Sequence, residues 1–434
     1  MDIDTKEQEK TAKELVEDKI LMYKKKKNIE LYKSYRVLSY DLLFYYAIIY
    51  LFLISQKGLT PGKVLEFDAF FIFFRFLVQI PVTILIQKIG KRKSIIFANF
   101  INVIHILLII FAPNYGVLLL SQLLCAIGFT IKATCETDML YDSIERGEKR
   151  GSIFARIDGK AMSRHYYFEA ISSVISGFLF VVNPYIPMVI CFIFLLVSAI
   201  ISTNFENVEQ KEKKLTIIEE YKNIKYSFKD IFKSKRLVSL LLFNGLMVAM
   251  IKIFQNIRNP ILLEVNMPEQ YFGVIFAVME ILAGIAAKYQ HKIHDRFRNK
   301  TLTFLGFPTA LSFLILGFLL AFNIDSKITI PIIIILFILQ YAMRGPYYVL
   351  IKRYLNNFTN SEKRVKIATV NNLIENLLVA ILMFGSAFVL DTMPVNLTLI
   401  IIGCGAVILT VLLLDYMRQT VGLKMEQYGK KDLL

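Results

Sequence analysis

The chain has 434 residues, of which 56% are hydrophobic and 20% are charged, and its mean hydropathy is +0.53. Soluble proteins contain about 25% charged residues and a more even balance of apolar and polar side chains, so this composition excludes an ordinary soluble domain. The net charge of +16 does not indicate nucleic-acid binding, because the basic residues concentrate in short loops between apolar segments.

The N-terminal segment, residues 1–37, mixes acidic residues with lysines and contains the run KKKK at 24–27. It has no apolar core that could cross a membrane. We therefore expect a cytoplasmic arm that is amphipathic or partly disordered.

Apolar segments of about 20 residues follow, which is the length that crosses a bilayer. They predict an all-α polytopic membrane protein with 12 transmembrane helices in two pseudo-symmetric bundles of six. The predicted spans lie near 38–56, 68–89, 93–112, 115–142, 161–183 and 186–203, and then near 237–256, 270–290, 300–322, 328–350, 366–390 and 394–415.

Residues 204–236 link the predicted bundles 38–203 and 237–415, and residues 416–434 form a cytoplasmic tail. Apolar side chains recur in the linker, which predicts a helix along the membrane surface. They are Ile217, Ile218, Tyr221, Ile224 and Tyr226.

The loops alternate in charge. Those after the second, fourth, eighth and tenth spans are rich in Lys and Arg, whereas the opposite loops contain Lys57, Lys63, Arg258 and Lys327. Basic loops stay in the cytoplasm, so we expect a multi-pass protein of the cell membrane with both termini inside. The basic loops are also expected to contact anionic lipid headgroups.

Ionisable residues inside the spans follow a repeating pattern. The interiors of spans 6, 9 and 12 have none, and span 3 has only His105. The other spans carry Arg75, Lys132, Glu136, Glu169, Lys252, Glu280, Arg344 and Glu375, and span 1 has Asp41 near its cytoplasmic end. Intramembrane charge is tolerated where it faces protein or a water-filled cavity, so spans 3, 6, 9 and 12 are expected on the outside. The other eight would surround a central cavity, with a three-helix repeat that is typical of major facilitator transporters.

Two loop motifs point to the same family. The loop after span 2 reads TILIQKIGKRK, where Lys88, Gly90, Lys91 and Arg92 match the family pattern GxxxDRxGRR, although Thr83 and Gln87 replace its first glycine and its acid. The loop after span 8 reads HDRFRNK and retains Asp295 and Arg296. Residues 38–415 thus resemble a major facilitator superfamily transporter, similar to loosely classified bacterial drug and solute exporters.

The resemblance implies a cytoplasmic gate. Asp142, at the cytoplasmic end of span 4, resembles the carboxylate that latches the basic loop when the cavity opens outward, with Lys88, Lys91 or Arg92 as its partner. A solvated carboxylate at a helix end is the alternative. The Gly-Pro antiporter motif expected in span 5 of many exporters is absent, since AISSVISGFLFVVNP contains Gly177 alone.

Span 4 carries an ion pair, Lys132 and Glu136, four residues apart and therefore on one helix face. We expect the pair to face the cavity, for substrate contact or proton coupling, with a static pair that holds span 4 against a neighbour as the alternative. In span 10, Tyr341 shares a face with Arg344. For proton coupling, Glu136 and Glu169 rank first because each has an ionisable neighbour, followed by Glu375 and then Glu280.

The predicted function is secondary active transport of a small amphiphilic or zwitterionic solute by alternating access, as proton-coupled efflux. The first alternative is a proton-coupled importer of an organic anion or short peptide. The second is a transport-dead sensor or partner subunit. No nucleotide-binding loop or metal-ligand cluster is visible, so we expect no cofactor and no enzyme activity, and a monomer whose partners are the solute, protons and membrane lipids.

Overall fold

The computed structural model describes the backbone of residues 2–145, 147–208, 226, 232–322, 325–357 and 364–421. Within these ranges the regular structure is helical. Apart from Tyr226, the linker residues that predict a surface helix lie outside the described residues, and so does most of the tail 416–434.

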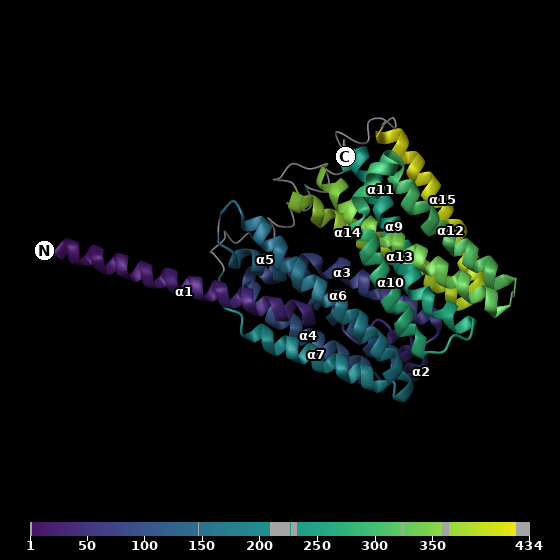
Figure 1. Cartoon of the computed structure of the whole chain (residues 1–434), viewed down its shortest axis with the longest axis horizontal. Coiled ribbons are helices and arrows are strands. Elements are labelled where there is room, and N and C mark those ends of the chain that lie inside the picture. The colour runs from purple at the N-terminus through teal and green to yellow at the C-terminus, as the bar shows by residue number, and fades with distance from the viewer. Residues whose placement is uncertain are drawn as a thin grey trace.

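The helices form two groups that follow each other along the chain (Figure 1). The first group is α1 (Asp2–Ser39), α2 (Ile49–Lys57), α3 (Pro61–Ile89), α4 (Lys91–Phe111), α5 (Tyr115–Ser143), α6 (Arg150–Val182) and α7 (Tyr185–Thr203). The second is α9 (Lys235–Glu264), α10 (Gln270–Lys288), α11 (Gln290–Phe297), η1 (Arg298–Lys300), α12 (Thr301–Ala321), α13 (Ser326–Asn357), α14 (Arg364–Thr392) and α15 (Val395–Val421).

Eleven of the described helices are long and apolar enough to cross a membrane. They are α3 to α7, α9, α10 and α12 to α15, and they correspond in order to predicted spans 2 to 12. The all-α, two-bundle prediction is confirmed. Several helices extend beyond their apolar segment: α6 begins at Arg150, and α9 continues to Glu264, past the predicted end at 256.

The first predicted span is not one continuous helix. Helix α1 ends at Ser39, residues 40–48 are non-helical with Phe44 at φ 61°, and α2 begins at Ile49. Asp41 offers the backbone an alternative to helical hydrogen bonds, since its Oδ1 accepts from the Leu42 N–H at 3.0 Å and from the Tyr46 hydroxyl. Such backbone is tolerated at membrane depth because it is buried in protein: Leu42, Leu43 and Ile48 are at most 3% exposed.

The N-terminal arm differs from the prediction as well. Helix α1 runs across the expected boundary at residue 37 and projects from the bundle at its N-terminal end (Figure 1). Its last turns are part of the first bundle, where Tyr32 and Tyr35 are fully buried. These turns pack against α5, α6 and α7. The end of α1 packs into the bundle because the aromatic residues among its lysines bury their rings there.

Caps define the connection between α2 and α3. Gly58 ends α2 with φ 64°, a left-handed conformation that suits glycine. Thr60 then caps α3, because its side chain accepts the Lys63 N–H at 3.2 Å, and Pro61 occupies the first helical position.

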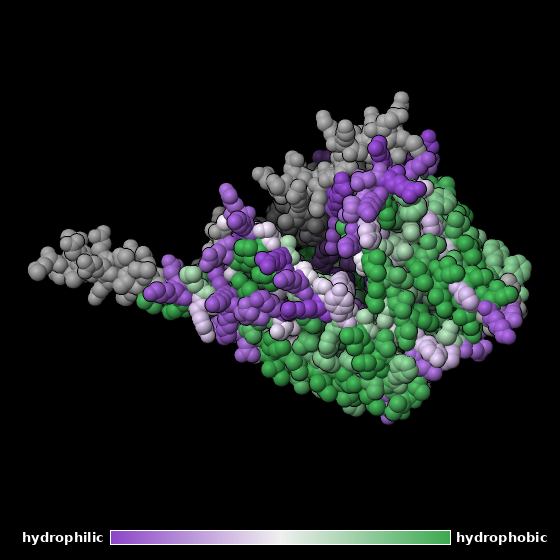
Figure 2. All heavy atoms as spheres, in the orientation of Figure 1, coloured by the Kyte–Doolittle hydropathy of each residue, from purple (hydrophilic) through white to green (hydrophobic). Residues whose placement is uncertain are grey.

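The two halves meet along α3 with α14 and along α6 with α10. At these crossings glycines bring the backbones together: a Cβ on Gly177 would lie 2.7 Å from the Gln270 carbonyl oxygen, and one on Gly62 would lie 2.6 Å from that of Ala387. The Thr60 hydroxyl also donates to Asp391, across the two halves. Figure 2 shows a hollow between the halves, away from these contacts and lined by hydrophilic residues, while hydrophobic residues cover much of the bundle.

Candidate functional site

A cavity of about 210 Å³ lies between the two halves. The non-helical segment 40–48 and helices α2, α3 and α6 line it from the first half, and α9, α10 and α13 from the second. Its lining is Tyr40, Asp41, Tyr46, Ile49, Tyr50, Leu53, Val64, Asp68, Tyr166, Glu169, Lys252, Gln255, Asn256, Arg258, Asn259, Phe276, Glu280 and Arg344.

The described lining residues include none from α4, α7, α12 or α15. These are the helices that the charge pattern places on the outside. The charged lining residues therefore all lie on segments that the pattern placed around the cavity, because a charged side chain is costly in lipid. Two helices that the pattern also placed there, α5 and α14, contribute no described lining residue.

Every charged side chain that the first half contributes to the cavity is a carboxylate. They are Asp41, Asp68 and Glu169. Asn256 of α9 hydrogen-bonds to Asp68, and Lys252 is near enough to interact with it electrostatically. Glu169 Oε2 lies 3.7 Å from His165 Nε2, while His165 Nδ1 is 2.7 Å from the Val37 carbonyl oxygen.

The second half contributes mainly cations. Arg344 Nη1 donates to Glu280 Oε1 at 2.6 Å, with side-chain exposures of 22% and 16%. Arg258 Nη1 donates to the Tyr341 hydroxyl at 3.0 Å, and Lys252 is the third cation. Tyr341 itself is buried behind the wall, where its ring lies 5.0 Å from the Arg344 guanidinium carbon.

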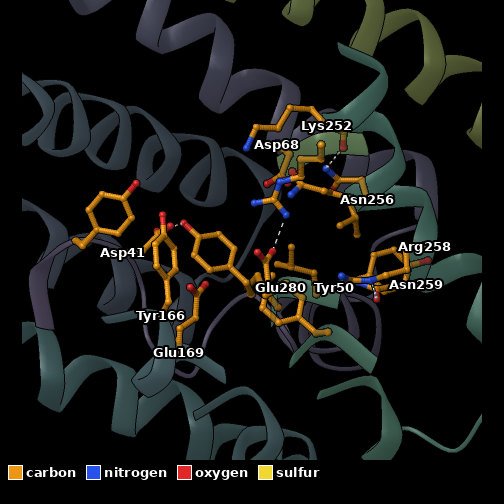
Figure 3. A pocket seen from close by; sticks show the side chains of 18 residues that line it. Asp41, Tyr50, Asp68, Tyr166, Glu169, Lys252, Asn256, Arg258, Asn259 and Glu280 are labelled. Carbon is orange, nitrogen blue, oxygen red and sulfur yellow. Dashed lines mark hydrogen bonds and ion pairs between the residues drawn. The ribbon is translucent and has the colours of Figure 1, made fainter. Parts of the chain in front are cut away.

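The cavity is therefore electrically bipolar. Figure 3 shows Asp41, Tyr166 and Glu169 on one side and Arg258 and Asn259 on the other, with Glu280 between them and Asp68 next to Lys252. A solute that carries both an ammonium and a carboxylate group can interact with both walls at once. A plain anion or cation would leave one wall without a counter-charge, which is costly where water is scarce.

Glu375 belongs to a separate polar cluster at the interface of α9, α13 and α14. Asn244 Nδ2 donates to Glu375 Oε2 at 2.7 Å and to Asn371 Oδ1 at 3.2 Å, and the Tyr347 hydroxyl donates to Asn244 Oδ1 at 2.9 Å. Arg75 of α3 and Lys252 are close enough to Glu375 to interact electrostatically. The cluster adjoins the cavity, since Lys252 faces both.

Lys132 and Glu136 are not where the sequence analysis expected them. Both are buried inside the first half, at 3% and 1% exposure, and neither lines the cavity. Lys132 Nζ lies 4.0 Å from Glu136 Oε1 and donates to the Ser39 carbonyl oxygen. Glu136 is paired with Arg36 of α1, which the sequence analysis had assigned to the arm. This geometry corresponds to the alternative, a static ion pair between helices.

The expected gate residues fall into two groups. Lys91 Nζ lies 2.7 Å from Asp142 Oδ2, so the basic loop contacts this carboxylate, but α4 and α5 both belong to the first half and the contact does not join the two halves. Asp142 also lies 3.7 Å from Arg150, and Arg92 donates to the Thr203 and Phe205 carbonyl oxygens. Gly90 has φ 86° and separates α3 from α4, while Lys88 is exposed. In the second half, Asp295 and Arg296 are exposed on α11.

Sequence reasoning missed several lining residues for identifiable reasons. Arg258 was counted as a loop residue, yet it lies within α9 at 3% exposure. Asp41 was placed at the end of a continuous helix, whereas the break in the chain brings it to the cavity. Asp68 shares a helix face with Arg75, seven residues further on, and was expected to face the bundle interior, but it was not counted among the site residues.

Comparisons with known proteins agree with this arrangement. The sequence profile described as Major Facilitator Superfamily matches residues 37–323. A search of curated protein sequences finds no significant match.

Solved transporter structures share the fold at low sequence identity. The nucleoside transporter NupG is 10% identical, with a TM-score of 0.71, over 91% of this chain and 99% of its own. A POT family transporter in complex with 5-aminolevulinic acid is 13% identical, with a TM-score of 0.66, over 92% and 96%. A bacterial homologue of the lysosomal transporter Spinster, in an inward-facing and occupied conformation, is 13% identical, with a TM-score of 0.61, over 94% and 98%.

Proposed function

The chain belongs to the major facilitator superfamily, and on that premise we propose that it is a secondary active transporter of a small zwitterionic solute, which crosses the membrane through the central cavity by alternating access. The observation that carries this proposal is the distribution of charge in the cavity. Carboxylates come from the first half, and Lys252, Arg258 and Arg344 come from the second.

This distribution couples substrate binding to the motion of the halves. An ammonium group on the wall of Asp41 and Glu169 and a carboxylate on the opposite wall would bridge the two bundles. The cavity of about 210 Å³ is smaller than the roughly 300–1,000 Å³ of drug-sized sites. It therefore favours a solute of amino-acid to dipeptide size over a large drug. The structural relative that binds 5-aminolevulinic acid is itself occupied by a molecule of this size class.

The conformation is proposed to face the cytoplasm. The halves are in contact near Thr60 and Asp391, at the end opposite the basic loops. The excess of Lys and Arg assigns those loops to the cytoplasm. We therefore propose that the cavity opens inward, that both termini are cytoplasmic, and that Thr60 and Asp391 belong to the closed outer gate.

Glu169 is the best-supported proton-coupling residue. Its side chain is 12% exposed in the cavity, and His165, at 3.7 Å, is a weak partner compared with the guanidinium that pairs with Glu280. A carboxylate that is nearly buried without a close fixed cation exchanges protons more readily than a tightly paired one. Glu136 has the opposite character, because Arg36 holds it inside the bundle.

The direction of transport is proposed as proton-coupled efflux, and import of a short peptide or organic anion is the alternative. Proteoliposomes that contain the purified protein are given a pH gradient of each sign, with labelled amino acids and dipeptides outside. Accumulation driven by an acidic interior supports efflux by antiport, and accumulation driven by an acidic exterior supports the importer. No flux or counterflow with any solute would favour a sensor or partner subunit instead.

Charge variants test the bipolar cavity directly. Lys252→Gln removes a cation from the wall that would receive the carboxylate, so the affinity for a zwitterion should fall at least tenfold, since a charged hydrogen bond contributes about 1.5–3 kcal/mol. A solute of the same shape whose carboxylate is amidated should lose much less. Lys93→Gln, at an exposed position outside the cavity, is the matched control. Equal losses for both solutes would contradict the proposal.

A further inference from the structure

A second cavity, of about 380 Å³, lies between α1 and α6, outside the central site. Its lining combines cations with small apolar side chains and includes no carboxylate: Lys33, Ile153, Arg156, Ile157, Lys160, Ala161 and Arg164. Figure 1 shows α1 entering the bundle beside α5 and α6, and Figure 2 shows hydrophilic surface in this region, with hydrophobic surface below it.

Among the described residues, the cations of α6 in this cavity have no ion-pair partner. Within the described ranges, Arg156, Lys160 and Arg164 have no carboxylate within 4.0 Å, and Lys33 pairs with the exposed Glu30. They follow each other at four-residue intervals, so they lie on one helix face and repel each other. A bound anion would offset that repulsion.

The outer surface of α6 sets the depth of the cavity in the membrane. Beyond Arg164, the exposed side chains on this face are an aromatic residue and then apolar ones, namely Tyr167, Ile171, Ile175, Phe178 and Val182. From Arg164 to Val182 the helix rises about 27 Å, at 1.5 Å per residue. Because the hydrocarbon core is about 30 Å thick, Arg164 lies at its edge, at the level of the phospholipid phosphates. Lys160 and Arg156 lie about one and two turns further toward the water.

We propose that this cavity is a binding site for an anionic membrane phospholipid. The phosphate contacts Arg164 and Lys160, the rest of the headgroup extends toward Arg156 and Lys33, and an acyl chain follows the apolar face of α6. The cations could bind any phosphate ester. The continuous apolar face next to them favours a lipid over a soluble phosphate. Since Lys33 belongs to α1, the bound headgroup joins α1 to α6.

Lipid binding to purified protein in detergent tests the site. Wild-type protein should bind phosphatidylglycerol in preference to phosphatidylcholine, as measured by the rise in melting temperature with added lipid and by the lipids retained in native mass spectrometry. The variant R156Q/K160Q/R164Q should bind phosphatidylglycerol roughly 100-fold more weakly, because each basic residue near an anionic surface contributes about 1 kcal/mol.

The matched control is K93Q/K288Q/K300Q, which removes the same charge at exposed positions outside the cavity. It should retain phosphatidylglycerol binding. Equal losses in both triple variants would overturn the proposal, because they indicate a non-specific response to net charge. Protection by soluble glycerol phosphate as strong as that by the lipid would overturn it too.

Single variants serve if the triple variant does not fold. Arg164→Gln and Lys33→Gln should each weaken binding several-fold while the melting temperature in phosphatidylcholine is unchanged; unchanged phosphatidylglycerol binding in both would contradict the site. The result is independent of the transport proposal, because it measures lipid binding and not flux.

Discussion

At the scale of single residues, the Glu136 carboxylate is held by several buried partners. It accepts hydrogen bonds from the Tyr35 hydroxyl at 2.5 Å, from the Ser39 hydroxyl at 3.3 Å and from Arg36. Removal of one partner of a buried ion pair leaves a charge without compensation and costs about 3–5 kcal/mol, whereas replacement of both partners costs much less. The network therefore holds α1 against α5. It stabilises the fold only while all of its charged partners are present.

Glu136→Gln should consequently destabilise the protein strongly, because it leaves the buried Arg36 and Lys132 without this carboxylate, and the double variant Arg36→Gln/Glu136→Gln should recover part of the loss. Thermal unfolding of the purified protein measures both. Lys63→Gln, which breaks the exposed pair with Glu66 at 2.7 Å, is the control and should cost at most about 1 kcal/mol. A double variant less stable than Glu136→Gln alone would show that Arg36 does not depend on Glu136 in this way.

At the scale of helices, the crossing of α6 and α10 depends on glycine. A Cβ on Gly273 would overlap the Ser173 carbonyl group, and Gly177 faces Gln270 in the same crossing. Backbone oxygens cannot move aside as the end of a flexible side chain can. The close approach of the two halves at this end is therefore possible only while these positions have no side chain.

Gly273→Ala should open the crossing and shift the protein toward the conformation in which the outer gate is apart. Spin labels at Leu59→Cys and Met393→Cys, on opposite halves, would report a longer distance in pulsed dipolar spectroscopy. Gly284→Ala on the same helix is the control, since a Cβ there meets nothing within 4 Å. An unchanged distance distribution in Gly273→Ala would mean that the crossing tolerates the side chain and does not act as a gate.

At the scale of the whole molecule, the chain enters the first bundle through the long helix α1, followed by the non-helical residues 40–48. Transporters use discontinuous helices where backbone groups must approach a substrate, and here the break brings Tyr40, Asp41 and Tyr46 to the cavity wall. The orientation of the entire bundle then depends on which side the basic loops occupy.

The proposed orientation makes Met393 extracellular and Lys292 cytoplasmic. In a background without the native cysteines, Met393→Cys should react with a membrane-impermeant maleimide in intact cells, and Lys292→Cys should react after permeabilisation only. Both positions are exposed, so burial does not limit the reaction. The reverse pattern of labelling would invert the topology and assign the open hollow to the outside.

Much of the fold was predictable because a membrane-spanning helix must be about 20 residues long and mostly apolar. Length and hydropathy identified the long apolar helices α3 to α7, α9, α10 and α12 to α15, and the helices without internal charge, α7, α12 and α15, contribute no described residue to the cavity. Of the expected cavity residues, Glu169, Lys252, Glu280 and Arg344 do line the cavity. These predictions succeed because the free-energy cost of an ionised group in hydrocarbon can be judged from one segment alone, without knowing which segments pack beside it.

The sequence by itself thus determined the long apolar helices from α3 onward, the family of the chain and which helices carry internal charge. Only the tertiary structure decided which charged residues line the same cavity. Glu136 pairs with Arg36, which belongs to a helix that the sequence analysis assigned to the N-terminal arm. Asp41 lines the cavity because residues 40–48 are not helical. The reason is that hydropathy is a local cost of contact with lipid, whereas the partner of a buried charge depends on contacts between segments about 100 residues apart.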